Sequence, residues 1–250
     1  MEEKMSDKLV VCMGKGAQKD LAASLANKMN VPLVEKPGEE LTLLVDSKGV
    51  SLCGFGLSYQ GCFDDQMLRR VSDGRLQHEM LVRVTKTKEE HPKAIDATAG
   101  MGEDSFLLAA AGYEVTMYEQ NPVIGALLKD ALRRAKKHPQ LKPIVERMHL
   151  IEGNSIELLA NQIDKPHVIY LDPMFPQRQK TGLINKKLQL IQKLEQPCTS
   201  EQELLEVAKN LAPEKIVVKR PLKGTFLAGE EPNYSVKGKA IRYDCYVPWK

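Results

Sequence analysis

Short apolar runs alternate with amphipathic stretches along the chain from Lys93 onward. Runs of this length between turn residues predict strands, and the stretches between them predict helices. Such alternation is typical of a mostly parallel sheet with helices on both faces. Strands are predicted at Ala94–Asp96, Glu114–Tyr118, His149–Ile151, Val168–Leu171 and Lys215–Lys219, with a closing antiparallel hairpin at Tyr234–Lys237 and Ala240–Val247. Helices are predicted at Ser105–Ala111, Pro122–Lys136, Ile156–Ile163 and Glu201–Leu211. The pattern therefore predicts an α/β, Rossmann-like fold.

The first ninety residues show a different, smaller pattern. It predicts a strand at Leu9–Met13, a helix at Gln18–Met29, a hairpin formed by Leu41–Val45 and Val50–Cys53, and a further helix at Leu76–Val84. The stretch Lys86–Pro92 is polar and reads as a linker. We therefore predict a small N-terminal α/β module over residues 1–90 and a main domain over residues 91–250.

Composition narrows the class of protein. The chain has 250 residues, of which 42% are hydrophobic, enough for a sizeable core. No stretch approaches the ~20 apolar residues of a membrane span, and the first residues lack the plan of a signal peptide, so we expect a cytoplasmic protein. The five cysteines form no C-x-x-C pair and the five histidines show no ligand spacing, which predicts reduced thiols and no metal.

A glycine turn follows the first strand of the main domain. Gly100 and Gly102 allow the backbone to turn tightly and to approach a ligand. Glu119 ends the next strand, about 20 residues on, where a ribose hydroxyl of a nucleotide-type cofactor would lie. Glu103 and Asp104 would repel a pyrophosphate and tolerate a cation, so the sulfonium and amino group of S-adenosylmethionine (SAM) fit better than NAD or FAD.

Two polar residues follow the third strand. Asn154 and Ser155 offer donors and acceptors to the edge of an adenine. They are also ordinary helix N-cap residues, and the sequence leaves both interpretations open.

The segment Asp172-Pro173-Met174-Phe175-Pro176 directly follows the apolar run Val168–Leu171. An exocyclic amine on a nucleobase needs its lone pair localised before it can attack a methyl donor. Asp172 can accept a hydrogen bond from that amine, and Phe175 can stack on the base. Pro173 and Pro176 fix φ and hold the loop extended. A proline-rich turn with no catalytic role is the alternative.

The net charge is only +3, but basic residues gather after this segment. Residues 177–193 carry no acidic side chain, and further basic residues follow on the last strands. A solvated surface is the ordinary explanation of such a run; beside a base-sized cleft, a polyanionic substrate is favoured. The candidate substrate residues are Pro173, Arg178, Lys180, Lys186, Lys187, Lys219 and Arg220. Arg69, Arg70 and Arg75 could also face substrate, although solvated arginines are the simpler interpretation.

Four motifs together resemble the bacterial RsmJ-type small-subunit ribosomal RNA guanine-N2 methyltransferases. They are Asp96–Gly102, Tyr118–Pro122, Tyr170–Pro176 and Val217–Pro221. The resemblance implies a class I methyltransferase sheet, SAM as cofactor, and one methyl added to the exocyclic N2 amine of a guanosine in 16S ribosomal RNA or the small subunit, guanosine 1516 in the family. The implied cofactor residues are Asp96, Gly100, Gly102, Glu103, Asp104, Glu119, Gln120, Asn154, Ser155 and Asp172.

Several alternatives stay open at this point. The same chemistry could act on adenine N6 in DNA or on a protein amide. A nucleotide-binding oxidoreductase and a catalytically silent RNA-binding assembly factor are competitors from other classes. The sequence does not indicate an oligomeric state.

Overall fold

A computed structural model describes residues 9–38, 41–173, 190–191, 194 and 200–247. Its contacts divide into two compact units. Among the described residues, the first contains 9–38, 41–62, 121–134, 190–191 and 194, and the second contains 63–120, 135–173 and 200–247. Residues 63–90 thus group with the larger unit, whereas the sequence assigned them to the N-terminal module. Whether residues 1–90 form a domain of their own stays a prediction.

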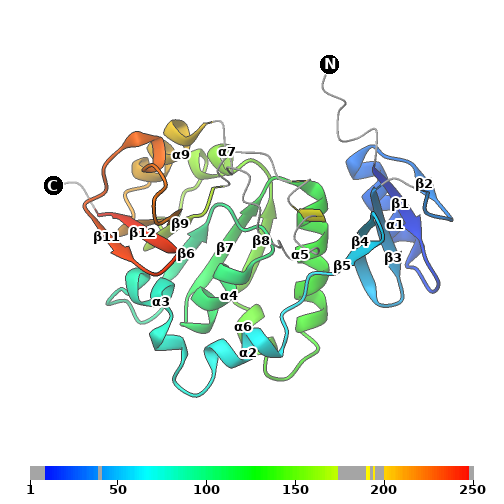
Figure 1. The fold of residues 1–250 in the computed structure, drawn as a ribbon, viewed down its shortest axis with the longest axis horizontal. Helices are drawn as coiled ribbons and strands as arrows, with labels where there is room; N and C mark the ends of the chain where they lie inside the picture. Colours follow the sequence, from blue (N-terminus) through cyan, green and yellow to red (C-terminus); the bar gives the residue numbers. More distant parts are fainter. Residues whose placement is uncertain (1–8, 39–40, 174–189, 192–193, 195–199, 248–250) are drawn as a thin grey trace. The chain divides into compact units, whose positions relative to one another are not determined.

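The larger unit is built on a seven-stranded sheet, counted over the described residues, with the order β11-β12-β10-β9-β6-β7-β8 (Figure 1). Its strands are β6 (Lys93–Asp96), β7 (Glu114–Glu119), β8 (Met148–Glu152), β9 (Val168–Leu171), β10 (Lys215–Pro221), β11 (Tyr234–Lys237) and β12 (Ile241–Tyr246). β12 runs antiparallel to β10 and β11, and the remaining neighbours pair in parallel. The predicted parallel sheet with a closing antiparallel hairpin is confirmed.

The helices of this unit are α2 (Asp65–Val71), η2 (Leu76–His78), α3 (Met80–Thr85), α4 (Glu103–Ala110), α6 (Lys142–Val145), α7 (Ser155–Ala160), α9 (Glu201–Asn210) and η3 (Leu227–Gly229). Because side chains alternate along a strand, each strand presents two faces. Ile95, Ile169 and Ile216 lie in a buried cluster with side chains of α7 and α9. The intervening positions, among them Asp96 and Tyr170, belong to the other face. None of the helices described is long and apolar enough to cross a bilayer.

The helix predicted over Leu76–Val84 is interrupted, and that prediction is wrong in part. Glu79 is extended (φ −63°, ψ 124°) between η2 and α3. Its carboxylate accepts two hydrogen bonds from Arg70, at 2.8 and 3.0 Å. This tertiary ion pair accompanies the break between the two short helices. α2 was not predicted, although Asp64 caps it by accepting from the backbone N–H groups of Gln66 and Met67.

The smaller unit has a sheet of order β2-β1-β3-β4-β5 in its described residues. Its elements are β1 (Leu9–Met13), α1 (Lys19–Met29), β2 (Leu33–Val34), β3 (Leu41–Asp46), β4 (Gly49–Gly54), β5 (Leu57–Tyr59) and α5 (Pro122–Ala135). The predicted hairpin forms between β3 and β4. Gly49 (φ 127°) approaches the carboxylate of Asp130 so closely that a Cβ would lie 2.3 Å from it. This position therefore requires glycine.

Candidate functional site

The candidate site lies where the carboxyl ends of β6, β9 and β10 meet at one edge of the larger sheet. Parallel pairing sets Asp96 opposite Tyr170 and Leu171 opposite Val218. Extending the second register by one residue brings Lys219 beside Asp172. Ligands of open α/β sheets bind at this edge, so chain topology alone brings these side chains to the place where chemistry is expected.

A lysine bridges two carboxylates at this edge. Lys219 Nζ lies 2.7 Å from Asp104 Oδ2 and 2.9 Å from Asp172 Oδ2. The hydroxyl of Tyr170 donates to the same oxygen of Asp104, at 2.6 Å. Burial and the charges of Asp104 and Asp172 raise the pKa of the Tyr170 hydroxyl, so Tyr170 remains a donor. The four side chains form one continuous ionic and hydrogen-bonded group.

Asp172 is the member of this group that is open to a ligand. Its side chain is 37% exposed, against 19% for Asp104. Its backbone N–H donates to Thr98 Oγ1 at 2.6 Å, which ties the end of β9 to the glycine loop. Burial raises the pKa of the Asp172 carboxyl, while Lys219 acts in the opposite direction. Asp172 is therefore a positioned acceptor whose ionised form depends on Lys219.

The glycine loop has the predicted turn geometry. Gly100 (φ 53°) and Gly102 (φ 77°) are both left-handed. The N–H of Gly100 donates to Glu119 Oε2 at 2.9 Å, joining the loop to the end of β7. A Cβ built at Gly100 would meet nothing within 4 Å, so the backbone borders open space there. Gly100, which borders open space beside the nearly buried carboxylate of Glu119, offers a place that suits the ribose of SAM.

Asp96 lies beneath this loop and is structural. It is 1% exposed and accepts hydrogen bonds from Ser105 Oγ (2.5 Å) and from the N–H of Thr98 (3.1 Å). Burial raises the pKa of Asp96 from 3.8 to about 7, despite both hydrogen bonds. Asp96 holds the loop against α4 and has no surface to offer a cofactor.

This raised pKa predicts a pH effect on stability. The native chain retains a proton on Asp96 that the unfolded chain releases, so this stabilisation is complete below about pH 4 and is lost as the pH rises through about 7. In Asp96→Asn, the amide can maintain both hydrogen bonds without titrating. We expect the difference in unfolding free energy, wild type minus variant, to fall by about 2 kcal/mol from pH 5 to pH 7.5. Urea unfolding measures it; a constant difference would contradict the assigned pKa.

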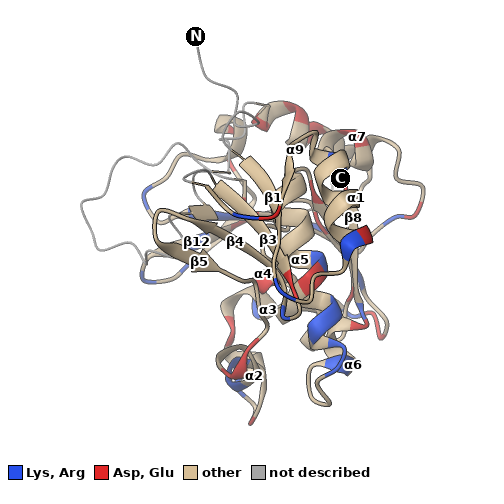
Figure 2. Cartoon of the chain, turned by 90° about the vertical axis from the view of Figure 1, so that its right-hand side faces the viewer, with Lys and Arg blue, Asp and Glu red and all other residues tan. Residues whose placement is uncertain are grey.

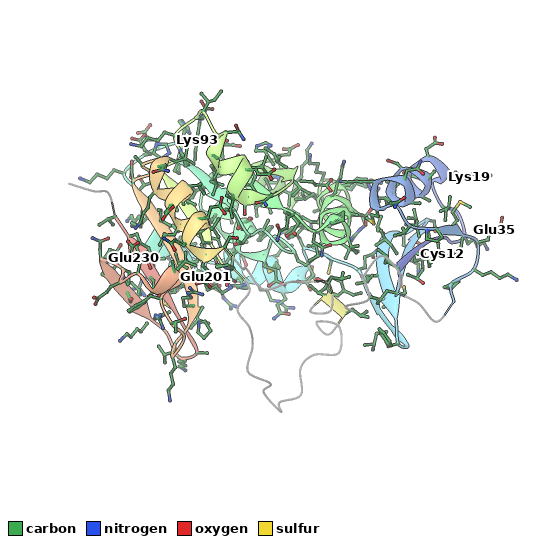
Figure 3. All side chains as sticks on the ribbon, turned by 90° about the horizontal axis from the view of Figure 1, so that it is seen from above. Cys12, Lys19, Glu35, Lys93, Glu201 and Glu230 are labelled. Atoms are coloured by element: carbon green, nitrogen blue, oxygen red, sulfur yellow. The ribbon has the colours of Figure 1, made fainter. Side chains whose placement is uncertain are left out.

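Two predicted substrate residues lie elsewhere than the prediction required. Arg220 is 1% exposed, and its guanidinium donates to Glu201 at 3.2 and 3.3 Å; Glu201 is labelled on α9 in Figure 3. A buried, paired guanidinium does not reach a phosphate. Lys219 is held by Asp104 and Asp172. Both positions argue against phosphate contacts, and Lys219 acquires a role beside Asp172 instead.

Of the remaining predicted site residues, some lie in the described part of the chain and others lie outside it. Asn154 caps α7 by accepting a hydrogen bond from the N–H of Ile156 at 2.9 Å, which agrees with its interpretation as a helix N-cap. Ser155 begins α7, Glu103 and Gln120 are exposed, and Pro173 is buried. Residues outside the described part of the chain are Phe175, Arg178, Lys180, Lys186 and Lys187; their roles stay predictions.

Three residues of the site were missed from the sequence. Tyr170 precedes Asp172 by two residues on one strand, so the period-2 pattern could have placed both side chains on one face. Thr98 and Ser105 are short hydroxyl residues inside and just after the predicted loop. Their partners become visible only when β6, β9 and α4 are brought together.

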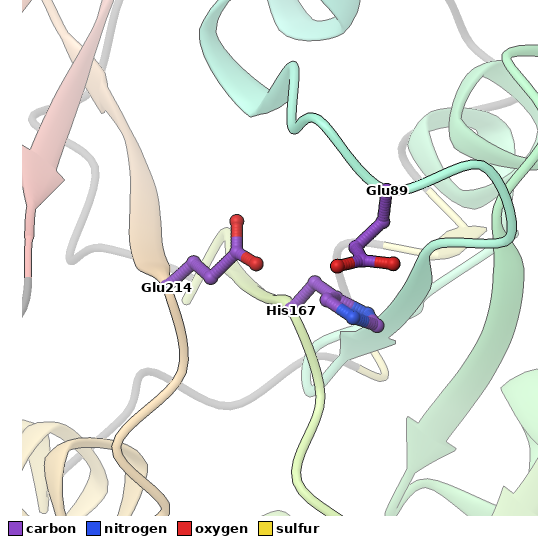
Figure 4. A group of neighbouring side chains, drawn as sticks. All are labelled: Glu89, His167 and Glu214. Carbon is purple, nitrogen blue, oxygen red and sulfur yellow. The ribbon is translucent and has the colours of Figure 1, made fainter.

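A second group of ionisable residues comprises Glu89, His167 and Glu214, whose ligand atoms lie within 4.8 Å of one another (Figure 4). The backbone N–H of Lys93 donates to His167 Nδ1 at 2.9 Å. The neutral ring then carries its proton on Nε2, which leaves neither nitrogen with a lone pair for a metal. Metal-binding histidines normally donate from their second nitrogen. The group is better suited to hydrogen bonding than to coordination.

Comparisons with known proteins agree with this geometry. Residues 25–248 match the family described as "Putative SAM-dependent methyltransferase". Ribosomal RNA small subunit methyltransferase J of Thioalkalivibrio sulfidiphilus is 37% identical over 238 residues, covering 92% of this chain and 93% of the relative. The Pseudomonas fluorescens (strain Pf0-1) protein of the same name is 39% identical, covering 90% and 89%.

A solved structure extends the similarity to three dimensions. The crystal structure of a SAM-dependent methyltransferase from Neisseria gonorrhoeae has a TM-score of 0.75 and 31% identity, and the match covers 96% of each chain. The similarity thus spans both units rather than the sheet alone. The chain belongs to the family of SAM-dependent methyltransferases that includes ribosomal RNA small subunit methyltransferase J.

Proposed function

We propose that this protein transfers a methyl group from SAM to the exocyclic N2 amine of a guanosine in 16S ribosomal RNA, with guanosine 1516, the family's target, as the position. The observation that carries the proposal is Asp172, a half-buried carboxylate at the end of β9, held beside the cofactor loop by Lys219 and Thr98. Relatives named ribosomal RNA small subunit methyltransferase J supply the substrate class.

Asp172 acts by accepting a hydrogen bond from the guanine amine. The bond turns the nitrogen lone pair away from the ring and fixes its direction, so alignment is the main catalytic contribution. When bound, SAM supplies the methyl group on an electrophilic sulfonium. An amine that has been alkylated becomes acidic and loses its proton readily to water or to Asp172. No covalent enzyme intermediate is required.

The guanosine must be reachable before Asp172 can meet it. In paired RNA the N2 amine is engaged, so the substrate is a loop, an open segment or a flipped nucleotide. Phe175, two residues beyond the buried Pro173, is our candidate for stacking on the base. Arg178, Lys180, Lys186 and Lys187 remain candidates for phosphate contacts.

We expect Glu119 to contribute strongly to the affinity of the protein for SAM. Glu119→Ala removes both the carboxylate at the ribose position and the acceptor of the Gly100 N–H. We expect the Kd for SAM, measured by isothermal titration, to rise about 10- to 100-fold, the range of a lost hydrogen bond to a charged group. Glu114→Ala, at the exposed start of the same strand, is the matched control. Unchanged affinity in the Glu119 variant would remove this residue from the cofactor site.

The acceptor class is tested with tritiated SAM. Purified protein is incubated separately with 16S RNA, small subunits, DNA and a protein extract, and label is counted in each. We expect transfer to RNA or to small subunits alone. Label in DNA or protein would redirect the proposal to adenine N6 or to an amide; RNA binding without transfer, in a protein that binds SAM, would favour a silent assembly factor.

A further inference from the structure

A basic hollow of about 500 Å³ lies on the larger unit, outside the site described above. It is formed by α2, η2 and the turn between them. Its lining residues are Gln66, Arg69, Arg70, Arg75, His78 and Glu79. Figure 2 marks basic residues on α2 in blue. Three arginines against one carboxylate give the hollow an excess of positive charge.

The hollow is held by fixed local structure. Phe63, just before α2, stacks on Phe106 of α4 with ring centroids 5.3 Å apart and planes inclined by 18°. After α2, Asp73 (φ 55°) and Gly74 (φ 73°) are both left-handed and reverse the chain. The N–H of Arg75 then donates to the carbonyl of Ser72 at 3.0 Å. This turn returns Arg75 to the side of α2 that carries Arg69 and Arg70.

One arginine of the three is already neutralised. Arg70 donates to both oxygens of Glu79, which leaves Arg69 and Arg75 to supply the excess charge. Both are exposed, and neither guanidinium has a carboxylate partner in the described part of the chain. Arg69 Nε donates to the carbonyl of Asp65, at 3.2 Å, which fixes this side chain against α2. Two guanidinium groups in one hollow, neither paired with a carboxylate of the described residues, suit a phosphate, whose oxygens match the arginine fork.

The hollow also lies near the cofactor loop. α2 and α3 both pack on α4, the helix that begins with Glu103 and Asp104. The hydrogen bond with Glu79 raises the pKa of Arg70, and the charges of Asp104 and Glu103 raise it further. Arg70 therefore interacts electrostatically with the two carboxylates at the start of α4. A chain of nucleotides entering the site could have its backbone in this hollow.

We propose that Arg69 and Arg75, supported by Gln66 and His78, bind backbone phosphates of the RNA beside the target guanosine. This inference rests on the proposed function. It adds a phosphate-binding surface for the RNA outside the cleft that binds the base. Phosphate contacts fix register and carry no sequence information, so the arginines should contribute to affinity for RNA of any sequence.

The test is the double variant Arg69→Gln/Arg75→Gln, compared with Lys136→Gln/Lys137→Gln. The control removes the same charge from exposed residues outside the hollow. RNA affinity is measured by fluorescence anisotropy between about 0.05 and 0.3 M salt. Losing two phosphate contacts should weaken binding about 10- to 30-fold near 0.1 M salt and reduce the log–log salt slope by roughly 1.4. The Kd for SAM and the unfolding midpoint serve as checks that the variant remains folded.

The outcomes separate this inference from the proposed function. A wild type that methylates RNA, together with a double variant whose affinity and salt slope equal those of the lysine control, would overturn the arginine site alone. A wild type that neither binds nor methylates RNA would overturn both. Loss of affinity for an acidic protein, with RNA binding unchanged, would assign the hollow to another partner and also refute the inference.

Discussion

Asp172→Ala eliminates methyl transfer: we expect kcat to fall by at least about 10³-fold, the upper range for loss of one preorganised hydrogen-bonding group. The variant loses the acceptor that directs the amine lone pair. Because the glycine loop and Glu119 remain joined through the Gly100 N–H, part of the SAM affinity should persist. Single-turnover methylation with saturating SAM measures the chemical step, and isothermal titration measures the cofactor separately.

Two further variants make this result specific. Asp172→Asn preserves size and one acceptor oxygen but removes the charge, so it should retain more activity than Asp172→Ala. Asp20→Asn, on the exposed face of α1, is the matched control and should behave as wild type. An Asp172→Ala enzyme that turns over at a rate near the wild type would remove Asp172 from the reaction.

Lys219→Met shifts the pH dependence of turnover toward alkaline pH. Lys219 stabilises the ionised form of Asp172 against burial, so its removal raises the pKa of that carboxyl. At a fixed pH near 7 a smaller fraction of Asp172 is then ionised, and activity recovers as the pH increases. At any pH below the raised pKa, each unit of increase lowers the single-turnover rate about tenfold, so the acid limb of the rate profile moves to higher pH.

The conservative variant distinguishes this effect from a general loss of structure. Lys219→Arg maintains a cation between Asp104 and Asp172, so the acid limb of its rate profile should lie near that of the wild type. A purely structural role would lower the amplitude in Lys219→Met without moving the limb. Rate profiles from about pH 5.5 to 9 decide between the two; an unmoved limb in Lys219→Met would contradict the role assigned here.

The strand pattern predicted most of the larger sheet because its strands are short, apolar and separated by clear turn residues. Val168–Leu171, predicted as a buried strand, is β9 with those bounds, and all four residues are buried. The glycine turn was also predictable, since Gly100 and Gly102 adopt left-handed angles that other residues rarely adopt. Turn residues and the hydrophobic pattern of the strands were thus sufficient to predict the architecture of this sheet.

The basic residues of the last strands show where local reasoning ended. Counting charges grouped Lys219 and Arg220 as substrate contacts, yet neighbours on one strand point to opposite faces. Lys219 meets Asp104 and Asp172 on one face, and Arg220 meets Glu201 of α9 on the other. This alternation along the strand could have shown that Lys219 and Arg220 do not share one role. The partners of each residue could not be predicted, because they come from segments far apart in the chain.

The measurement that tests the central claim most directly is nucleoside analysis of the methylated RNA. Small subunits and 16S RNA from a strain lacking this gene are incubated with the protein and labelled SAM, digested to nucleosides and separated by mass-spectrometric chromatography. We predict label in N2-methylguanosine from wild type and none from Asp172→Ala. Label in another nucleoside, or no transfer from a protein that binds SAM, would contradict the assignment of the guanine N2 amine as the acceptor.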